Sequence, residues 1–506
     1  MIDEKIGIVF NYNQLPDVSK FPFIISLKKE RGIVRKGQFV CTKSEEGFLI
    51  GMIERILILN EYFSDALTIK AYNDNNNPNI LKDLFPSEDF EFSIAIVKNL
   101  GIVTFKNQED TCIEKINRMT YPARPGAEVF MVKREIISAF LGFDPNMGLD
   151  IGTLKVSETK ALIDMNRLLG KHLGILAISG AGKSYLTSVL LEELLSYDKS
   201  GGIPAIFLID VHGEYTYLKD IPELKNKVSV QDASYFQIAV PKMSASSFRK
   251  YQSEISNVQL RDLSKYINKL KKAKKSYTIS DIIKCLEVEQ EGSKTSRQAL
   301  IGWLDALNNL RLFGPSENPT LKNIIKPQKL VIIDLQKEIN IRKKQIIVDY
   351  LCSRLFYMRR MDDVPPFLLI IEEAHQFSPE AAHSKAISKS IIETIAREGR
   401  KFMACLCLIS QRPKKLSTTA LSQLNSKMIL NIKNPYDLKH LMESSEAITK
   451  DYTDMISSLG VGEMLLMGNA INYPVFINIR QRAFKAKNSD INLSRVCLNW
   501  QENKLI

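Results

Sequence analysis

The residues best suited to chemistry are 177–184, which read Ala-Ile-Ser-Gly-Ala-Gly-Lys-Ser between an apolar run and a helix-length segment. A phosphate group needs many donors that converge on it: glycines admit the backbone, helix N-terminal amides surround the β-phosphate, a lysine adds charge, and a serine hydroxyl reaches Mg²⁺. Ala177 replaces the first glycine of the strict pattern, which is tolerable if that position needs no positive φ. We therefore predict a P-loop that binds ATP and Mg²⁺ through Ser179, Gly180, Ala181, Gly182, Lys183, Ser184 and Tyr185.

A second apolar run, residues 367–371, is followed directly by Glu372 and Glu373. Carboxylates at the end of a buried strand suit phosphoryl transfer, so we expect Glu372 to hold Mg²⁺ through water and Glu373 to polarise the attacking water. The first acid is aspartate in many such enzymes, which leaves the division of roles between the two glutamates open. In the alternative interpretation the pair simply begins a helix, where negative charge suits the helix dipole.

A third apolar run ends at Asp210 and continues through His212 and Gly213 to Glu214. The carboxyl edge of a doubly wound sheet is where such folds bind ligands. We expect Asp210 or Glu214 to orient water or metal at the nucleotide, and His212 to respond to the γ-phosphate. The alternative is a plain turn centred on Gly213.

Arginine and glutamine side chains flank a further apolar run. Arg397 and Arg400 are three residues apart and are expected on one helical face, from which both point across a subunit boundary to a transferring phosphoryl group. Gln411 follows the run and suits a sensor that links the γ-phosphate to loop position. Either arginine has the simpler alternative of capping a helix or pairing with Glu393.

These residues need a parallel sheet to position them. Apolar runs of five to seven residues without alternation indicate strands buried on both faces and covered by helices, an α/β class. The expected strands are 172–178, 203–210, 330–334, 367–371, 404–409 and 428–432, with a helix over 184–196. We place this RecA-like ATPase core at residues 156–235 and 322–485.

The remaining segments have other patterns. Residues 1–155 contain short β-branched and aromatic runs at 6–10, 23–27, 37–42, 48–59 and 90–105, which predict a small β-barrel. Residues 236–321 predict a helical insertion in which residues 261–275 carry seven basic side chains and one acidic, either a basic functional face or an ordinary solvated one. Residues 486–506 resemble a surface extension.

Composition narrows the class of protein. The 506 residues are 45% hydrophobic and 25% charged, and 69 Lys plus Arg against 57 Asp plus Glu give a formal net charge of +12, which favours an anionic partner. Seven scattered cysteines indicate a reducing compartment. No signal peptide and no apolar run long enough for a membrane span are evident, so we expect a cytoplasmic protein.

Taken together, the ordered motifs resemble the HerA ATPases of the FtsK–HerA superfamily. The residues that carry the resemblance are 166–172, 179–184, 209–215, 372–375, 396–401, 410–413 and 459–463, and the N-terminal runs are similar to the barrel, of the HAS type, that precedes the HerA motor. The resemblance implies a ring, expected to be a hexamer, with ATP at subunit boundaries and double-stranded DNA in a central channel.

The resemblance also implies partners and further site residues. HerA motors work with NurA-type nucleases beside Mre11–Rad50 in DNA end resection and double-strand break repair, which implies a DNA translocase or helicase. Related proteins pair with sirtuin-type effectors in anti-phage defence, so a ring scaffold that activates an effector is the alternative. Lys171 stands where the family often has an arginine that reaches a neighbour's nucleotide, although a point charge lacks the planar fork. Arg480 and Arg482 are expected to line the interface.

Two basic segments are candidates for contact with DNA. One is the loop after Pro413, which carries Lys414 and Lys415, and the other is the basic part of the helical insertion. The sequence does not decide between them.

Overall fold

The computed structural model describes residues 2–11, 15–25, 34–60, 63, 65–74, 91–105, 113–198, 201–273, 276–288, 293–380, 385–444, 450–484, 494, 497, 498 and 500. The chain forms two compact units, Met1–Ile163 with Ile471–Asn478 and Asp164–Ala470 with Ile479–Ile506. It therefore passes between the units three times. In the described part of the chain, no helix is both long and apolar enough to cross a membrane.

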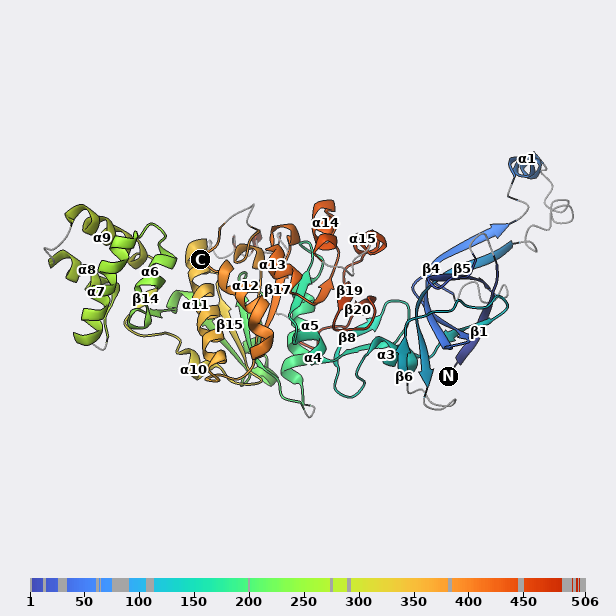
Figure 1. Ribbon diagram of the computed structural model, residues 1–506, viewed down its shortest axis with the longest axis horizontal. Helices are drawn as coiled ribbons and strands as arrows, with labels where there is room; N and C mark the ends of the chain where they lie inside the picture. Colours follow the sequence, from blue (N-terminus) through green and yellow to red (C-terminus); the bar gives the residue numbers. More distant parts are fainter. Residues whose placement is uncertain are drawn as a thin grey trace. The chain divides into compact units, whose positions relative to one another are not determined.

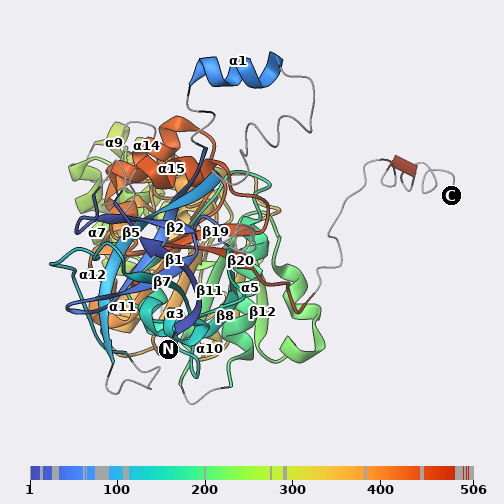
Figure 2. The ribbon, with the colours of Figure 1, turned by 90° about the vertical axis from the view of Figure 1, so that its right-hand side faces the viewer.

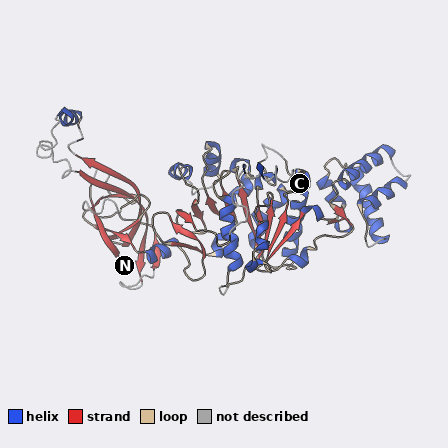
Figure 3. Ribbon diagram, turned by 180° about the vertical axis from the view of Figure 1, so that it is seen from behind, coloured by secondary structure: helices blue, strands red, loops and turns tan. Residues whose placement is uncertain are grey.

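The first unit contains a closed six-stranded antiparallel barrel (Figures 1 and 3). The strand order is β2-β1-β7-β3-β4-β5, pairing of β2 with β5 closes the barrel, and β6 extends it beside β5. The strands are β1 (Ile2–Val9), β2 (Lys20–Ile25), β3 (Phe39–Ser44), β4 (Gly47–Asn60), β5 (Glu91–Phe105), β6 (Ile113–Asn117) and β7 (Glu128–Val132). Alternating side chains such as Phe21, Phe23, Val97 and Val129 fill its core.

The rest of the first unit combines α1 (Ala66–Asp74), α3 (Arg134–Leu141), β8 (Leu149–Leu154) and β9 (Lys160–Ile163) with a segment from far along the chain. In that segment, the ring of Tyr473 stacks on Phe140 with centroids 4.8 Å apart, and its hydroxyl donates to the carbonyl of Leu100 at 2.6 Å. The side-chain amide of Asn472 donates to the carbonyl of Phe140 at 2.7 Å. These contacts attach residues 471–478 to the first unit.

The second unit is built on a sheet, part of which is labelled in Figure 1. Its strand order is β12-β15-β11-β16-β17-β10-β18-β19. All of these strands run parallel except β19, which is antiparallel to β18. The strands are β10 (Leu173–Leu176), β11 (Ala205–Asp210), β12 (Val228–Asp232), β15 (Leu330–Asp334), β16 (Phe367–Ile371), β17 (Ala404–Ser410), β18 (Ser426–Ile429) and β19 (Glu463–Gly468). Parallel order places the carboxyl ends of β10, β11, β16 and β17 at one edge of the sheet.

Helices cover this sheet, so the predicted α/β class with a preceding barrel is confirmed (Figures 1 and 2). They include α4 (Met165–Leu169), α5 (Lys183–Ser196), α10 (Leu321–Ile324), α11 (Ile341–Arg360), α12 (Lys389–Glu398), α13 (Thr418–Ser422), α14 (Pro435–Glu443) and α15 (Lys450–Ser457). The central strands β11, β16 and β17 are buried along their whole length, as their unbroken apolar runs predict.

Helices also fill the segment between β12 and β15. They are α6 (Ala245–Tyr251), α7 (Asn257–Ala273), α8 (Ile279–Val288) and α9 (Lys294–Asn308). The short strands β13 (Ile238–Ala239) and β14 (Phe313–Gly314) pair in parallel and bring the two ends of the segment together. A 2.5 Å ion pair between Lys250 and Asp349, and a 2.8 Å bond from Arg342 to the carbonyl of Tyr251, join α6 to α11.

Candidate active site

The predicted P-loop connects β10 to α5. Gly180 and Gly182 have φ of +78° and +96°, and Gly182 is the N-cap of α5. L-residues with a Cβ rarely adopt these angles, so the two glycines are required by the backbone. Ala177 is buried at the end of the strand and has no positive φ, which explains why alanine is accepted there.

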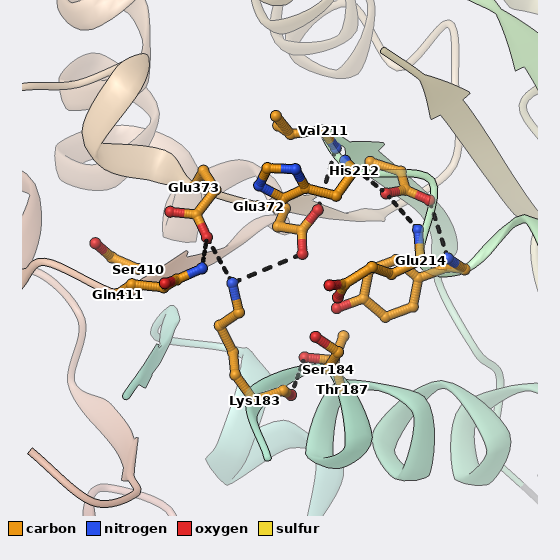
Figure 4. A network of polar contacts seen from close by, with 12 residues as sticks. Lys183, Ser184, Thr187, Val211, His212, Glu214, Glu372, Glu373, Ser410 and Gln411 are labelled. Atoms are coloured by element: carbon orange, nitrogen blue, oxygen red, sulfur yellow. Dashed lines mark hydrogen bonds and ion pairs between the residues drawn. The ribbon is translucent and has the colours of Figure 1, made fainter. Parts of the chain in front are cut away.

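Lys183 reaches from the first turn of α5 to the carboxyl end of β16 (Figure 4). Its Nζ lies 2.6 Å from Oε1 of Glu373 and 3.7 Å from Oε1 of Glu372. The lysine side chain is only 7% exposed, so the ammonium lies between two buried carboxyl groups. The sequence prediction that these three residues act together is consistent with this geometry.

Glu373 has an unusual backbone and several partners. Its φ and ψ are 48° and 42°, a left-handed conformation that costs a non-glycine residue about 1–3 kcal/mol and often marks a functional position. The side-chain amide of Gln411, directly after β17, donates to Oε1 of Glu373 at 2.5 Å. The predicted P-loop lysine, catalytic glutamate and sensor glutamine therefore meet at one oxygen.

Two further residues, His375 and Ser410, lie at this point and have no predicted role. Nδ1 of His375, in the 3₁₀ turn η6 (Ala374–Gln376), lies 3.3 Å from Oε2 of Glu373 and 3.3 Å from Oγ of Ser410. Burial lowers the pKa of His375, an effect that nearby Glu373 opposes. The sequence signal that could have identified these two residues is their position beside predicted site residues. His375 follows Glu373 by two residues, and Ser410 directly precedes Gln411.

Glu372 is completely buried and only partly satisfied. Its Oε2 accepts the N–H of Val211 at 3.1 Å, whereas Oε1 faces Lys183 and has no hydrogen-bond partner among the residues that the structure describes. Burial raises the pKa of Glu372 to about 8, Lys183 opposes that rise, and the acids on the β11 loop reinforce it. A buried oxygen without a hydrogen bond beside the P-loop fits a water-mediated contact to Mg²⁺.

Asp210 lies at the predicted strand end, where its carboxylate bonds the backbone of its own loop. Its Oδ1 accepts the N–H groups of His212, Gly213 and Glu214 at 3.3, 2.7 and 3.1 Å, and Oδ2 accepts that of Tyr215 at 3.0 Å. These bonds use both carboxylate oxygens, so they do not support a role for Asp210 in orienting metal or water. Asp210 instead holds the loop in position, and the alternative of a turn around Gly213, φ +74°, describes the local structure better.

Glu214 and Ser184 are both at least partly exposed to solvent. Glu214 is exposed on the β11 loop, and Figure 4 shows its side chain extending toward the region between Glu372 and the start of α5. Ser184 is half-buried beside Lys183, with its carbonyl accepting the hydroxyl of Ser188 at 2.9 Å. Within the described residues, no group of three or more His, Cys, Asp or Glu side chains is arranged to hold a metal ion.

The two central arginines lie where an α-helix passes into a 3₁₀ turn, and the expectation that they share one helical face stays a prediction. Arg397 lies in the last turn of α12, whereas Arg400 lies in the 3₁₀ turn η7 (Gly399–Phe402). The turn begins at Gly399, where a Cβ would stand 2.5 Å from the carbonyl oxygen of Ala404. Both arginines are exposed, and in the described part of the chain Glu393 contacts Lys389 and Ser417.

The remaining predicted residues flank the P-loop. Arg480 bonds Glu192 at 3.2 Å and Glu193 at 2.8 Å on α5, away from the first turn. The guanidinium of Arg482 lies 4.6 Å from the ring centroid of Tyr185, and its backbone N–H donates to the tyrosine hydroxyl at 2.8 Å. These contacts place Arg482 nearer than Arg480 to the nucleotide loop.

Lys171 lies half-buried just before β10, and its carbonyl accepts the N–H of Asn425 at 3.2 Å. This position fixes the backbone at the start of the P-loop strand. No contact in the described residues assigns its side chain to the nucleotide, so its role between subunits stays a prediction.

Comparison with known proteins agrees with this geometry. Residues 149–355, which include the P-loop and the Asp210 loop, match the family described as the central domain of the helicase HerA. The chain is 29% identical over 510 residues to a probable helicase of Methanocaldococcus jannaschii, which covers 92% of this chain and 94% of that protein. It is 26% identical over 510 residues to the DNA double-strand break repair helicase HerA of Pyrococcus furiosus, covering 88% and 87%.

Among solved structures, VirB4 of Thermoanaerobacter pseudethanolicus superimposes with a TM-score of 0.52 at 14% identity, covering 67% of this chain and 98% of that one. This likeness concerns the fold alone.

Proposed function

We propose that this chain is a HerA-type P-loop ATPase that couples ATP hydrolysis to movement along double-stranded DNA in double-strand break repair. The names of its relatives support the repair setting. The finer proposal is a hexameric ring that translocates or unwinds DNA during end resection, with a NurA-type nuclease as partner and Mre11–Rad50 nearby.

One observation carries the catalytic part of the proposal: Lys183 and Gln411 meet at Oε1 of Glu373. An arriving ATP offers phosphate oxygens that compete for the Lys183 ammonium, which frees the carboxylate. Glu373 then accepts a proton from water as the water oxygen bonds to the γ-phosphorus and the bond to the bridging oxygen of ADP breaks. Gln411 keeps the carboxylate in place and registers the loss of the γ-phosphate.

The same site suits Mg²⁺ with ATP. Ser184 and the buried Oε1 of Glu372 are the residues that would hold the ion, the latter through water. When bound, the ion would neutralise charge on the β- and γ-phosphates. Arg397, Arg400, Lys171 and Arg482 are candidates to complete the site of an adjacent subunit.

A basic surface beside Gln411 supports contact with DNA. Lys414 and Lys415 lie exposed in the turn η8 (Pro413–Lys415), and Nζ of Lys414 is 4.5 Å from the ring centroid of Tyr436, which is itself 67% exposed. The N–H of Lys414 donates to the buried carboxylate of Asp437 at 2.9 Å, which fixes η8 against α14. We propose that this surface contacts DNA phosphates without reading sequence.

The experiment that tests the function is a comparison of Glu373→Gln with the parent chain. The variant should bind ATP and lose hydrolysis by about a hundredfold or more, because it cannot accept the proton. Exposed Glu287→Gln on α8 is the control for the charge change. Undiminished hydrolysis by Glu373→Gln would contradict the catalytic role.

A second measurement separates the motor from the ring scaffold. ATP turnover is measured with and without linear duplex DNA. Stimulation by DNA supports the motor, whereas unstimulated turnover together with activation of a partner effector supports the scaffold. The convergence of Lys183, Glu373 and Gln411 favours the motor, because a scaffold needs no hydrolytic site.

A further inference from the structure

Helix α7 of the insertion carries a row of like charges that the ATPase site does not use. Arg261, Lys265, Lys269 and Lys272 are spaced four, four and three residues apart, so they share one exposed face of the helix. The opposite face is apolar, with Leu263, Ile267 and Leu270 buried in the insertion. We name these four cations the α7 basic row.

Acidic side chains among the described residues neutralise little of the positive charge of the α7 basic row. Lys265 and Asp262 are 4.0 Å apart, at the limit of an ion pair, and the Lys265 side chain remains 76% exposed. Exposed pairs of this kind contribute little in water. Like charges four residues apart destabilise a helix, so the row gains from a bound polyanion that screens its repulsion.

A cavity of about 280 Å³ opens beside the same lysines, between α7, the end of α8 and the start of α9. Its lining is mainly polar, and the cationic members are Lys265, Lys269 and Arg297 against the single acid Asp262. The hydroxyl groups of Ser293 and Ser296 add donors. Small-molecule sites are mostly apolar, so this lining favours an anion rich in oxygen acceptors.

The extent of the row favours a polymer over a small anion. From Arg261 to Lys272 the helix advances about 16 Å at 1.5 Å per residue. One strand of duplex DNA presents a phosphate about every 3.4 Å along its axis, so this length passes about five phosphates. A single small anion would contact the cavity alone and leave Arg261 and Lys272 without a partner from the ligand.

We propose that the α7 basic row and the adjoining cavity form a second contact for the phosphate backbone of duplex DNA, on the insertion and separate from the η8 surface. The inference rests on the proposed function. It assigns a DNA-binding role to a segment that ATP binding and hydrolysis leave free, and it predicts that the row adds affinity without changing the hydrolytic step.

The test is the salt dependence of binding to a fluorescently labelled linear duplex by the full chain. Lys265→Ala with Lys269→Ala should weaken binding and reduce the slope of log affinity against log salt by about 1 to 2, because each lost phosphate contact removes about 0.9. The matched control, Lys284→Ala with Lys326→Ala, removes the same charge from exposed positions outside the row and cavity. ATP turnover without DNA and the melting temperature should match the parent in both variants.

The outcomes separate this inference from the proposed function. A parent chain that binds no duplex at low salt would overturn both. A parent that binds, with an α7 variant of equal affinity and slope, would overturn this inference alone and leave the row to an acidic protein partner. An equal loss in the control variant would also overturn it, because the effect would then be one of net charge.

Discussion

Two acid-bearing strand ends lie at the same edge of the sheet and behave in opposite ways. At the end of β11, Asp210 accepts four N–H groups from the loop that follows it. After β16, Glu372 and Glu373 present carboxyl oxygens to Lys183 from the P-loop. Both ends show the same sequence pattern, an acid after a buried apolar run, yet one end stabilises a loop and the other is suited to catalysis.

Side-chain length and the following residues explain the difference. The short aspartate side chain reaches the amides of the next few residues, and Gly213 with φ +74° lets those amides turn back toward it. Glutamate is one methylene longer and extends past the local backbone. Glu372 instead accepts the N–H of Val211 from the neighbouring loop, so the β16 end also helps to position the loop that follows β11.

The largest expected effect comes from removing the cation that distinguishes the β16 end. Lys183→Ala should abolish ATP binding and lower hydrolysis by about a thousandfold or more, the scale of losing a charge on a transferring phosphoryl group. Calorimetric titration with ATP and a phosphate-release assay measure it. A variant with near-normal turnover would mean that the two strand ends do not differ in the way described.

The next largest effect is expected from substituting Asp210 at the end of β11, and it should appear as a lower free energy of unfolding. Asp210→Ala leaves four N–H groups without their acceptor and should destabilise the second unit by about 2–4 kcal/mol. Asp210→Asn keeps an acceptor oxygen and should lose less. Chemical denaturation measures both, and a variant that is stable but inactive would support the expected role of Asp210 in orienting water or metal at the nucleotide.

A smaller effect is expected from the sensor. Gln411→Ala removes one hydrogen bond to charged Glu373, worth about 1.5–3 kcal/mol, so kcat should fall about tenfold to a hundredfold with little change in KM. Steady-state kinetics with the parent as reference measures the two constants. A change confined to KM would assign Gln411 to binding alone.

The smallest effect is a pH dependence of the protein without nucleotide or added metal. Because burial raises the pKa of Glu372 from 4.5 to about 8, the folded state holds a proton that the unfolded state has released. The stabilising contribution is complete below pH 4.5 and is lost as pH rises to about 8, at no more than about 1.4 kcal/mol per pH unit. Glu372→Gln should flatten this part of the stability curve, and an unchanged curve would place the proton elsewhere.

Much of the fold and site could be predicted from sequence because the signals are local. Unbroken apolar runs predicted the central strands, and the order of glycine, lysine and serine predicted the P-loop. Parallel topology then brought Lys183, Glu373 and Gln411 to one edge. Two features were not predicted: the hydrogen bonds of Asp210 to its own loop, which the shared pattern of an acid after a buried run does not reveal, and the change from α-helix to 3₁₀ turn at Gly399.

The barrel was harder to predict in detail. Strand β6 has three charged or polar residues among its five, so its pattern carries little hydrophobic signal. Residues 471–478 carry no mark in the sequence that links them to the first unit, because the contact of Tyr473 with Phe140 joins positions more than three hundred residues apart. Only the folded chain shows that association.

That association limits how the protein can be divided. Eight residues of the first unit, 471–478, lie C-terminal to the ATPase motifs in the sequence. Exchanging residues 1–163 alone would therefore not transfer the whole unit to another protein. A fragment that stops at Ile163 lacks the Tyr473 ring that stacks on Phe140 and the Asn472 amide that donates to the carbonyl of Phe140. Recombination between relatives that keeps this unit intact must therefore replace both ends of the chain together.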